Sequence, residues 1–312
     1  MPDPTPATLR HRLELLLYRL FTGLLALLPY RAALALGRGL GSLGSALSPR
    51  YRRMVRAHLE AADLGLDSSA IHRVQRDCFR HYGAMLMGML HRGNWTRDQV
   101  LAQVDVHGLE HWDAALAEGR GLIAFSGHFG DWEAMVTGMG AHGRGFALIG
   151  RPLNNQLLDP VLTELRQRFG NTHIPKSGAL RGCLQVLRAG QAVGFMLDQN
   201  ALEQGVFVDF LGRPASTHAS AALLAVKHDI PVLPMRSTPR PDGTVRVDLG
   251  PAIHLPTSGD LHRDAWIGTQ LMTRHLEGWI REQPSWWFWM HRRHKTRPTE
   301  HQPLAPEAWR IA

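Results

Sequence analysis

Short apolar runs alternate with helical patterns through the middle of the chain. Strands are predicted at residues 121–126, 146–150, 192–198, 230–235 and 244–249. Helices are predicted at residues 129–142, 155–170, 177–189, 216–228 and 260–283, and residues 50–115 are helical in pattern. Strands separated by helices indicate an α/β fold, with a mixed central sheet covered by helices.

The N-terminal region has a different pattern. Residues 13–28 read LELLLYRLFTGLLALL, an apolar run that is interrupted by Glu14 and Arg19. It is shorter than the roughly 20 apolar residues that a membrane-spanning helix needs. An arginine cluster follows instead of a small-residue cleavage site, which argues against a secretory signal. We predict an N-terminal membrane-associating helical segment that lies in the membrane plane or dips into it. A buried helical hairpin that caps the core is the alternative.

The distribution of charge supports contact with an acidic surface. The chain has 312 residues and a formal net charge of +8. Nine arginines against two acidic residues give residues 1–58 a charge of +7, whereas residues 59–290 carry −2 and residues 291–297 carry +4. A near-neutral body with two cationic ends suits anionic lipid or nucleic acid. The two cysteines are too few for a disulfide framework and favour a reducing compartment.

Near the C-terminus, residues 285–298 read SWWFWMHRRHKTRP. Trp286, Trp287 and Trp289 beside a cationic run are typical of a membrane interface. The alternatives are stacking on nucleobases or a core strand followed by a solvated tail. Together with the N-terminal segment, the pattern favours lipid, and no nucleic-acid partner is predicted. We divide the chain into the membrane-associating segment (1–58), a catalytic domain (59–298) and a tail (299–312).

Polar residues that could perform chemistry follow the first predicted strand of the sheet. Residues 121–126 are followed by GHFGDWE, which places His128 at a strand-to-helix turn between glycines. Ligands of α/β sheets collect at such strand ends. A neutral imidazole is a good general base near pH 7, and a carboxylate on its other nitrogen fixes the tautomer. Glu133 and Asp131 are the candidates for that carboxylate. No Ser or Cys has a nucleophile pattern, so the nucleophile is expected to be a substrate hydroxyl.

These residues resemble a known motif. His128 to Glu133 is similar to the HX4D/E motif of the glycerolipid acyltransferase superfamily, and the chain resembles the bacterial late acyltransferases of lipid A biosynthesis (lauroyl and myristoyl transferases). Further blocks carry the resemblance, namely GRPLNN at 150–155, DQN at 198–200, GVFVDFLGRPA at 205–215 and WMHRR at 289–293. The order and spacing of these blocks cover roughly residues 10–298.

The resemblance implies an enzyme at the cytoplasmic face of the cell inner membrane. It would move a fatty acyl chain from an acyl-carrier-protein or acyl-CoA thioester to a hydroxyl of a lipid A precursor or related glycolipid. His128 would be the general base and Glu133 its orienting partner, with Asp131 as the rival. Arg151 would hold a phosphate or the oxyanion. The substrate-pocket residues implied by the resemblance are Arg151, Asn154, Asp198 and Arg213. The alternative is that Asn154 and Asn155 cap a helix and that Asp198 closes a turn.

The implied partners agree with the cationic ends, because an acyl carrier protein and a phosphorylated lipid acceptor are both anionic. Met85, Met87, Met89 and Leu90 are candidates to line an acyl groove, although methionine is also a common core filler. His107/His111 and His291/His294 have ligand-like spacing but lack a third ligand, so we predict no metal, and no organic cofactor.

Two other functions remain open. Ala57-His58-Leu59, where many members of the family have an Asn-Leu pair, and the acidic Glu203 leave the acceptor uncertain. A phosphatidylinositol mannoside or another glycolipid is therefore an alternative acceptor. A non-enzymatic protein that binds membrane or nucleic acid through its basic ends is the other alternative, and it predicts that His128→Ala leaves function intact.

Overall fold

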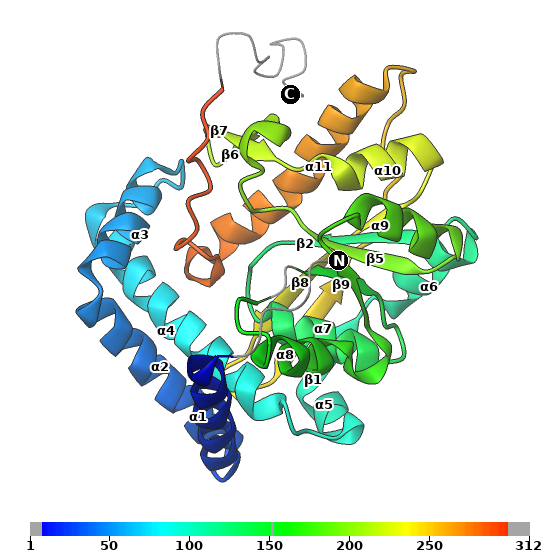
Figure 1. The fold of residues 1–312 in the computed structure, drawn as a ribbon. Helices are drawn as coiled ribbons and strands as arrows, with labels where there is room; N and C mark the ends of the chain where they lie inside the picture. The colour runs from blue at the N-terminus through cyan, green and yellow to red at the C-terminus, as the bar shows by residue number, and fades with distance from the viewer. Residues whose placement is uncertain (1–7, 151–152, 299–312) are drawn as a thin grey trace.

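The computed structural model describes residues 8–150 and 153–298. Its centre is a seven-stranded sheet with strand order β1-β9-β8-β2-β5-β3-β4 (Figure 1). These strands are β1 (Val104–His107), β2 (Leu122–Ser126), β3 (Ala147–Gly150), β4 (Thr172–Pro175), β5 (Ala192–Met196), β8 (Val232–Pro239) and β9 (Val245–Leu249). Neighbouring strands run parallel except β8 and β9, which are antiparallel. The predicted α/β fold with a mixed central sheet is confirmed.

The remaining elements surround this sheet. The helices are α1 (Leu9–Ala26), α2 (Tyr30–Leu47), α3 (Pro49–Ala61), α4 (Ser68–Arg92), α5 (Arg97–Gln103), α6 (Leu109–Ala117), α7 (Trp132–Ala141), α8 (Leu158–Gln167), α9 (Ala179–Arg188), α10 (Ser220–His228) and α11 (Leu261–Glu282). Short 3₁₀ turns are η1 (Arg168–Gly170), η2 (Leu202–Gln204) and η3 (Pro284–Trp286). A separate antiparallel hairpin consists of β6 (Val206–Phe210) and β7 (Arg213–Thr217).

Helices cover both faces of the sheet because its central strand, β2, is apolar on both sides. Leu122 and Ala124 pack into a core cluster with α5, α6 and α7. Ile123 and Phe125 point to the other face and pack with α9, α10 and α11. Every residue of β2 is buried, so the first polar groups after the strand lie at the carboxyl edge of the sheet.

The sequence pattern missed β1, β4 and the hairpin. β1 and β4 are four-residue edge strands with only one fully buried residue each, so neither contains an apolar run. The hairpin turns at Leu211 and Gly212, whose φ angles of 53° and 76° suit a two-residue type I′ turn. Because β7 extends through Thr217, the helix predicted from residue 216 begins at Ser220 instead.

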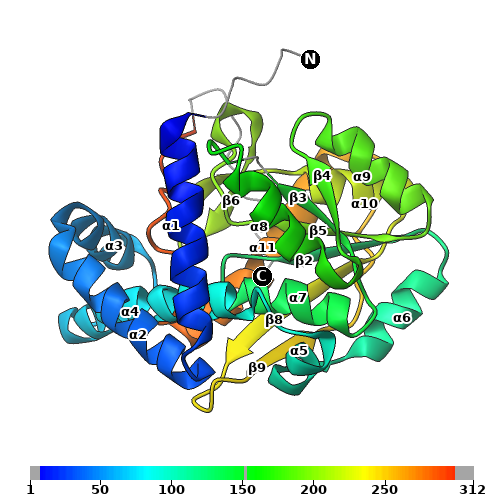
Figure 2. The same cartoon turned by 60° about the horizontal axis from the view of Figure 1, so that its bottom comes forward.

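Helices α1 to α4 form a layer beside the sheet, with α2 packed along α4 (Figures 1 and 2). Glycines allow the two backbones to touch. A Cβ at Gly37 would collide with the carbonyl of Gly83, and a Cβ at Gly41 would collide with the carbonyl of Phe79. These positions need glycine because no side chain fits between the helices.

We therefore expect Gly41→Val to destabilise the protein, by roughly 1–3 kcal/mol in the free energy of unfolding, the usual cost of an overpacked contact. Gly39→Val is the matched control, because a Cβ at Gly39 meets no atom within 4 Å. Denaturant titration in detergent measures both. Equal stability of the two variants would show that the α2–α4 contact does not depend on its glycines.

Exposed leucines cover the outer faces of α1 and α2. They are Leu13, Leu16, Leu17, Leu20 and Leu24 on α1, Leu27 directly after it, and Leu36, Leu40, Leu43 and Leu47 on α2, each between 40% and 79% exposed. Leu25, on the opposite face of α1, is buried and forms an apolar cluster with Ala33 and Met87. Within residues 8–150 and 153–298, no helix has the length and apolarity needed to cross a bilayer.

Residues 284–298, which we call the C-terminal strap, follow α11 and lie against the sheet edge and α4. Trp287 and Trp289 are 2% and 1% exposed, and Arg293 is 1% exposed. The expected interfacial position is therefore wrong for these two tryptophans. The alternative, a core strand followed by a solvated tail, is right about their burial but not about a strand, because the strap begins with the 3₁₀ turn η3 and continues to residue 298 without a strand. Arg293 is also buried rather than solvated. The predicted tail at 299–312 lies outside the described residues.

Candidate active site

His128 lies in the turn between β2 and α7, two residues beyond the end of β2. Gly130 in this turn has a φ of 62°, and a side chain there would collide with the carbonyl of Ser237 in β8. The turn therefore needs glycine to pass so close to the next strand. The His128 carbonyl accepts hydrogen bonds from the Tyr82 hydroxyl at 2.9 Å and from the Phe288 N–H at 3.1 Å. These bonds fix the backbone that carries the imidazole.

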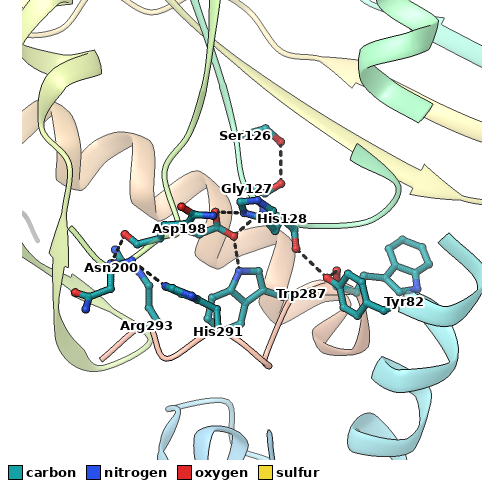
Figure 3. Close-up of polar contacts among 11 residues, drawn as sticks. Tyr82, Ser126, Gly127, His128, Asp198, Asn200, Trp287, His291 and Arg293 are labelled. Atoms are coloured by element: carbon teal, nitrogen blue, oxygen red, sulfur yellow. Dashed lines mark hydrogen bonds and ion pairs between the residues drawn. The ribbon is translucent and has the colours of Figure 1, made fainter. Parts of the chain in front are cut away.

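Asp198 lies beside His128 because β2 and β5 are parallel neighbours. Ser126 pairs with Met196, so the residues two positions further along each strand meet at the carboxyl edge. His128 Nδ1 is 2.8 Å from Asp198 Oδ1, and the His128 backbone N–H donates to Oδ2 at 2.7 Å (Figure 3). A carboxylate at Nδ1 holds the proton there and leaves the Nε2 lone pair available. Nε2 has no hydrogen-bond partner among the described residues, and the His128 side chain is 21% exposed.

A tryptophan completes the environment of this carboxylate. The indole N–H of Trp287 donates to Asp198 Oδ2 at 2.9 Å. Three N–H groups therefore converge on Asp198: the backbone N–H and the ring N–H of His128, and the indole N–H of Trp287. The Asp198 side chain is 2% exposed, so protein donors replace the water that an ionised carboxylate would otherwise bind.

The electrostatics of the pair favour an ionised Asp198. Burial alone would raise the pKa of this carboxyl, but the His128 charge and the hydrogen bonds from His128 and Trp287 lower it to about 2. Burial alone would likewise lower the pKa of His128. The Asp198 carboxylate outweighs that effect and raises the pKa of His128 above its ordinary value of 6.5. The geometry therefore provides an ionised carboxylate that stabilises a protonated imidazole.

The expected pairing of His128 with Glu133 or Asp131 is corrected by the structure. Asp131 is the N-cap of α7, accepting from the Ala134 N–H at 2.9 Å, and both its oxygens accept from Arg92 at 2.8 Å. Glu133, in the first turn of α7, points toward α8 and accepts from Arg166 Nε at 3.1 Å and from its terminal nitrogen at 2.5 Å. Both acids are thus directed away from the imidazole by the start of α7 and by arginines on neighbouring helices.

Glu133 nevertheless acts on His128 at longer range. Its charge raises the pKa of His128, and the charge of Arg166 lowers it. The Glu133–Arg166 pair lines a narrow cavity of about 20 Å³, together with apolar side chains that include Met89, Leu162 and Leu165. Of the four residues expected to line an acyl groove, only Met89 lines this cavity.

The other predicted substrate residues are not gathered around His128. Arg151 lies outside the described residues. Asn154 is exposed, and within the described ranges its side chain has no hydrogen-bond partner. Asn155 Oδ1 accepts from the Leu157 N–H at 2.9 Å just before α8. The N-cap of α8 is Leu157, so neither asparagine is the cap residue that the alternative expected. Arg213 is half-buried in β7 and has no hydrogen bond to His128 or Asp198.

The two histidine pairs with ligand-like spacing, His107/His111 and His291/His294, include members that bond to protein groups. His107 bonds Asp105 at 2.7 Å, and His291 Nε2 accepts from the Asn200 N–H at 2.9 Å. Among the described residues, no group of three or more His, Cys, Asp or Glu side chains is arranged to hold a metal ion. The absence of a metal and of an organic cofactor stays a prediction.

Sequence reasoning missed Arg166 and the role of the C-terminal strap. Arg166 is near the end of a predicted helix, where a basic residue is ordinary, so no local signal marks it. Trp287 follows α11, 89 residues after Asp198 in the sequence. A buried tryptophan needs a hydrogen-bond partner for its indole N–H. The sequence does not show that Trp287 is buried, so it does not reveal that need.

Comparisons with known proteins show which proteins the chain is similar to in sequence. The family model described as bacterial lipid A biosynthesis acyltransferase matches residues 7–296. The lipid A biosynthesis lauroyltransferase of Escherichia coli (strain K12) is 26% identical over 278 residues, which cover 87% of this chain and 88% of that protein. The lipid A biosynthesis palmitoleoyltransferase of the same strain is 28% identical over 286 residues, which cover 87% of both chains. The phosphatidylinositol mannoside acyltransferase of Mycobacterium tuberculosis (strain ATCC 25618 / H37Rv) is 32% identical over 136 residues, 41% of this chain and 42% of that protein.

Proposed function

Because this chain belongs to the bacterial lipid A biosynthesis acyltransferase family, whose members transfer acyl groups, we propose the following reaction for it. A fatty acyl chain moves from an acyl-carrier-protein or acyl-CoA thioester to a hydroxyl of a lipid A precursor or related glycolipid. The observation that supports this proposal is the His128–Asp198 pair at the carboxyl edge of the sheet, with Nε2 open. No nucleic-acid partner, metal or organic cofactor is part of the proposal.

In the proposed mechanism His128 is the general base. Nε2 takes the proton of the acceptor hydroxyl while the hydroxyl oxygen forms a bond to the thioester carbonyl carbon. The tetrahedral intermediate then collapses, the carbon–sulfur bond breaks, and the imidazolium returns the proton to the thiolate. Asp198 keeps the proton of the ground-state imidazole on Nδ1 and stabilises the imidazolium that forms.

We propose that Arg166 binds a negatively charged group, a phosphate or the oxyanion of the intermediate, near His128. Its side chain is 47% exposed, and its guanidinium donates hydrogen bonds to the Glu133 carboxylate. A guanidinium fork suits a phosphate or the oxyanion of the intermediate. Glu133 would then act by positioning Arg166. Arg151, Asn154 and Arg213 stay predicted substrate residues, and Asp131 acts in this proposal through the α7 cap and Arg92.

We propose that α1 and α2 bind the cytoplasmic face of the inner membrane, which would place the site near an insoluble acceptor. The exposed leucine faces of both helices support this, as do the arginines of residues 1–58, which suit anionic headgroups.

Leu20→Glu with Leu24→Glu should lower the affinity for vesicles of phosphatidylglycerol and phosphatidylethanolamine by at least about tenfold, because each buried leucine contributes roughly 1.5–3 kcal/mol. Cosedimentation measures it. Leu180→Glu, on α9, is the control because Leu180 is 50% exposed and lies far from α1 along the chain. Unchanged sedimentation of the double variant would contradict the proposed membrane face.

The acceptor is tested by product analysis. The purified protein in detergent is given membrane lipid extract and radiolabelled acyl-carrier-protein or acyl-CoA thioester in parallel, and the labelled lipid is identified by mass spectrometry. A labelled lipid A precursor supports the first acceptor. The similarity to a phosphatidylinositol mannoside acyltransferase makes such a glycolipid the second candidate. Labelling of no lipid from either donor would refute the proposed reaction.

A further inference from the structure

The C-terminal strap contacts both halves of the catalytic pair (Figure 3). On the His128 side, the Phe288 N–H donates to the His128 carbonyl at 3.1 Å, and the Gly130 N–H donates to the Trp286 carbonyl at 3.0 Å. Trp287 and Phe129 form an antiparallel bridge between these two bonds. The strap therefore pairs with the catalytic turn as a short strand does.

On the Asp198 side, the strap binds the next two residues of the chain. Arg293 donates to the Gln199 carbonyl at 3.1 Å, and His291 Nε2 accepts from the Asn200 N–H at 2.9 Å. The Asn200 amide donates to the Thr296 hydroxyl at 2.9 Å. The turn that carries Asp198 is thus held along its length by residues that follow α11.

Trp287 links these two sets of contacts. Its backbone lies against the His128 turn, and its indole N–H reaches Asp198 Oδ2 at 2.9 Å. The ring is held at an edge-to-face angle of 83° against Trp289, with centroids 4.6 Å apart, and of 64° against Phe210, 5.2 Å apart. A rigid, buried ring gives its N–H a fixed direction.

We propose that Trp287 is a positioning residue for catalysis: its indole N–H fixes one oxygen of Asp198, so that the other faces His128 Nδ1. The inference deepens the proposed function and rests on it for the effect on rate. Through the Trp287 side chain, the strap would orient the general base His128.

The charges around the pair determine the expected direction of the effect. Glu133 and Arg166 act on His128 with opposite signs, and His291 and Arg293 lie within electrostatic range of Asp198. None of these changes when Trp287 becomes Phe. The variant loses only a neutral donor to the carboxylate, so Asp198 attracts the imidazolium more strongly and the pKa of His128 rises further.

The test compares Trp287→Phe with Trp289→Phe. Trp289 is the matched control, because it is equally buried and phenylalanine keeps an aromatic ring against Trp287. The substitution removes only an indole N–H that donates at 2.7 Å to the Pro284 carbonyl inside the strap and not to Asp198. We expect Trp287→Phe to lower kcat about 10- to 100-fold, the scale of a hydrogen bond to a charged group. KM should stay nearly constant, and the acid limb of the pH–rate profile should move to higher pH. Trp289→Phe should show neither the kcat loss nor the pH shift.

A second readout does not require acyl transfer. Diethylpyrocarbonate modifies neutral imidazole, so its reaction with the His128 peptide, followed against pH by mass spectrometry, gives the pKa of His128 in each variant. An upward shift in Trp287→Phe alone supports the proposal. An unchanged titration in Trp287→Phe, or the same shift in Trp289→Phe, overturns it. If the wild type transfers no acyl group, the proposed reaction fails, while this titration still decides whether Trp287 positions the pair.

If Trp287→Phe does not fold, a second variant tests the same proposal. Replacing Trp287 by the benzothiophene analogue of tryptophan keeps the ring shape and removes only the N–H. The same shift in the His128 titration is expected, and an unchanged titration overturns the proposal.

Discussion

Replacing His128 by alanine should lower kcat for acyl transfer by about 10²- to 10⁴-fold, the usual contribution of a positioned general base. KM for donor and acceptor should change little, because the imidazole is proposed to act on the proton that moves in the transition state rather than on substrate binding. Steady-state kinetics in detergent, with radiolabelled thioester donor, measures the effect.

His262→Ala is a suitable control, because His262 is exposed and its imidazole has no hydrogen-bond partner among the described residues. It should retain wild-type rates. Added imidazole should restore part of the activity of His128→Ala, since the His128 side chain is 21% exposed and its removal leaves space next to Asp198. Equal rates for His128→Ala and wild type would mean that the base is elsewhere, and would return the non-enzymatic, membrane-binding alternative to consideration.

The sequence pattern predicts the interior strands of the sheet, which have a neighbouring strand on each side. β2 and β5 are short apolar runs bounded by glycine or polar residues, and both were located from that pattern alone. β1 and β4 were missed because edge strands expose most of their side chains and show no apolar run. Local patterns therefore located the strand that leads into the His128 turn but did not indicate which strand lies beside it.

That missing information explains the incorrect partner of His128. From the sequence, the nearest carboxylates are Asp131 and Glu133, three and five residues on. The carboxylate that reaches Nδ1 is Asp198, 70 residues on, because β5 is the parallel neighbour of β2 and their ends are in register. Strand order is a property of the whole fold, and no spacing rule within one segment could provide it.

The strap was misread for a related reason. Trp287, Trp289 and Arg293 form an aromatic and cationic pattern that is shared by membrane interfaces and by buried segments. Only the folded chain shows that Trp287 and Arg293 are directed at the Asp198 turn. The leucines of α1 and α2, by contrast, are exposed, and the membrane association of this segment stays a prediction.

Asp198→Asn should lower kcat by about 10³- to 10⁴-fold, comparable with the loss of the orienting carboxylate in a serine-protease triad. Three N–H groups converge on Asp198, two from His128 and one from Trp287. A carboxylate accepts all three, whereas an amide has one oxygen and must direct its NH₂ group at a donor. With the NH₂ toward Nδ1, the imidazole proton moves to Nε2 and the base is lost.

The pH–rate profile separates this effect from a general loss of structure. His128 is a base only when neutral, and because its pKa is raised above 6.5 by Asp198, the wild-type rate should rise with pH through a midpoint above 6.5. Asp198→Asn removes the charge that raises this pKa, so the midpoint should move to lower pH, opposite to the shift expected for Trp287→Phe. More imidazole is then neutral at pH 7 while kcat is far lower, which identifies the tautomer, rather than the protonation state, as the defect.

Glu133→Gln is the comparison that decides between the two carboxylates. It keeps the Asp198 contact at Nδ1 and removes a charge that acts on His128 from farther away, while it releases Arg166. We expect its pH midpoint to fall less than that of Asp198→Asn, and its KM to rise as Arg166 loses its position. If the midpoint falls further in Glu133→Gln than in Asp198→Asn, Glu133 governs the base in solution, and the pairing that the HX4E spacing first suggested is the functional one.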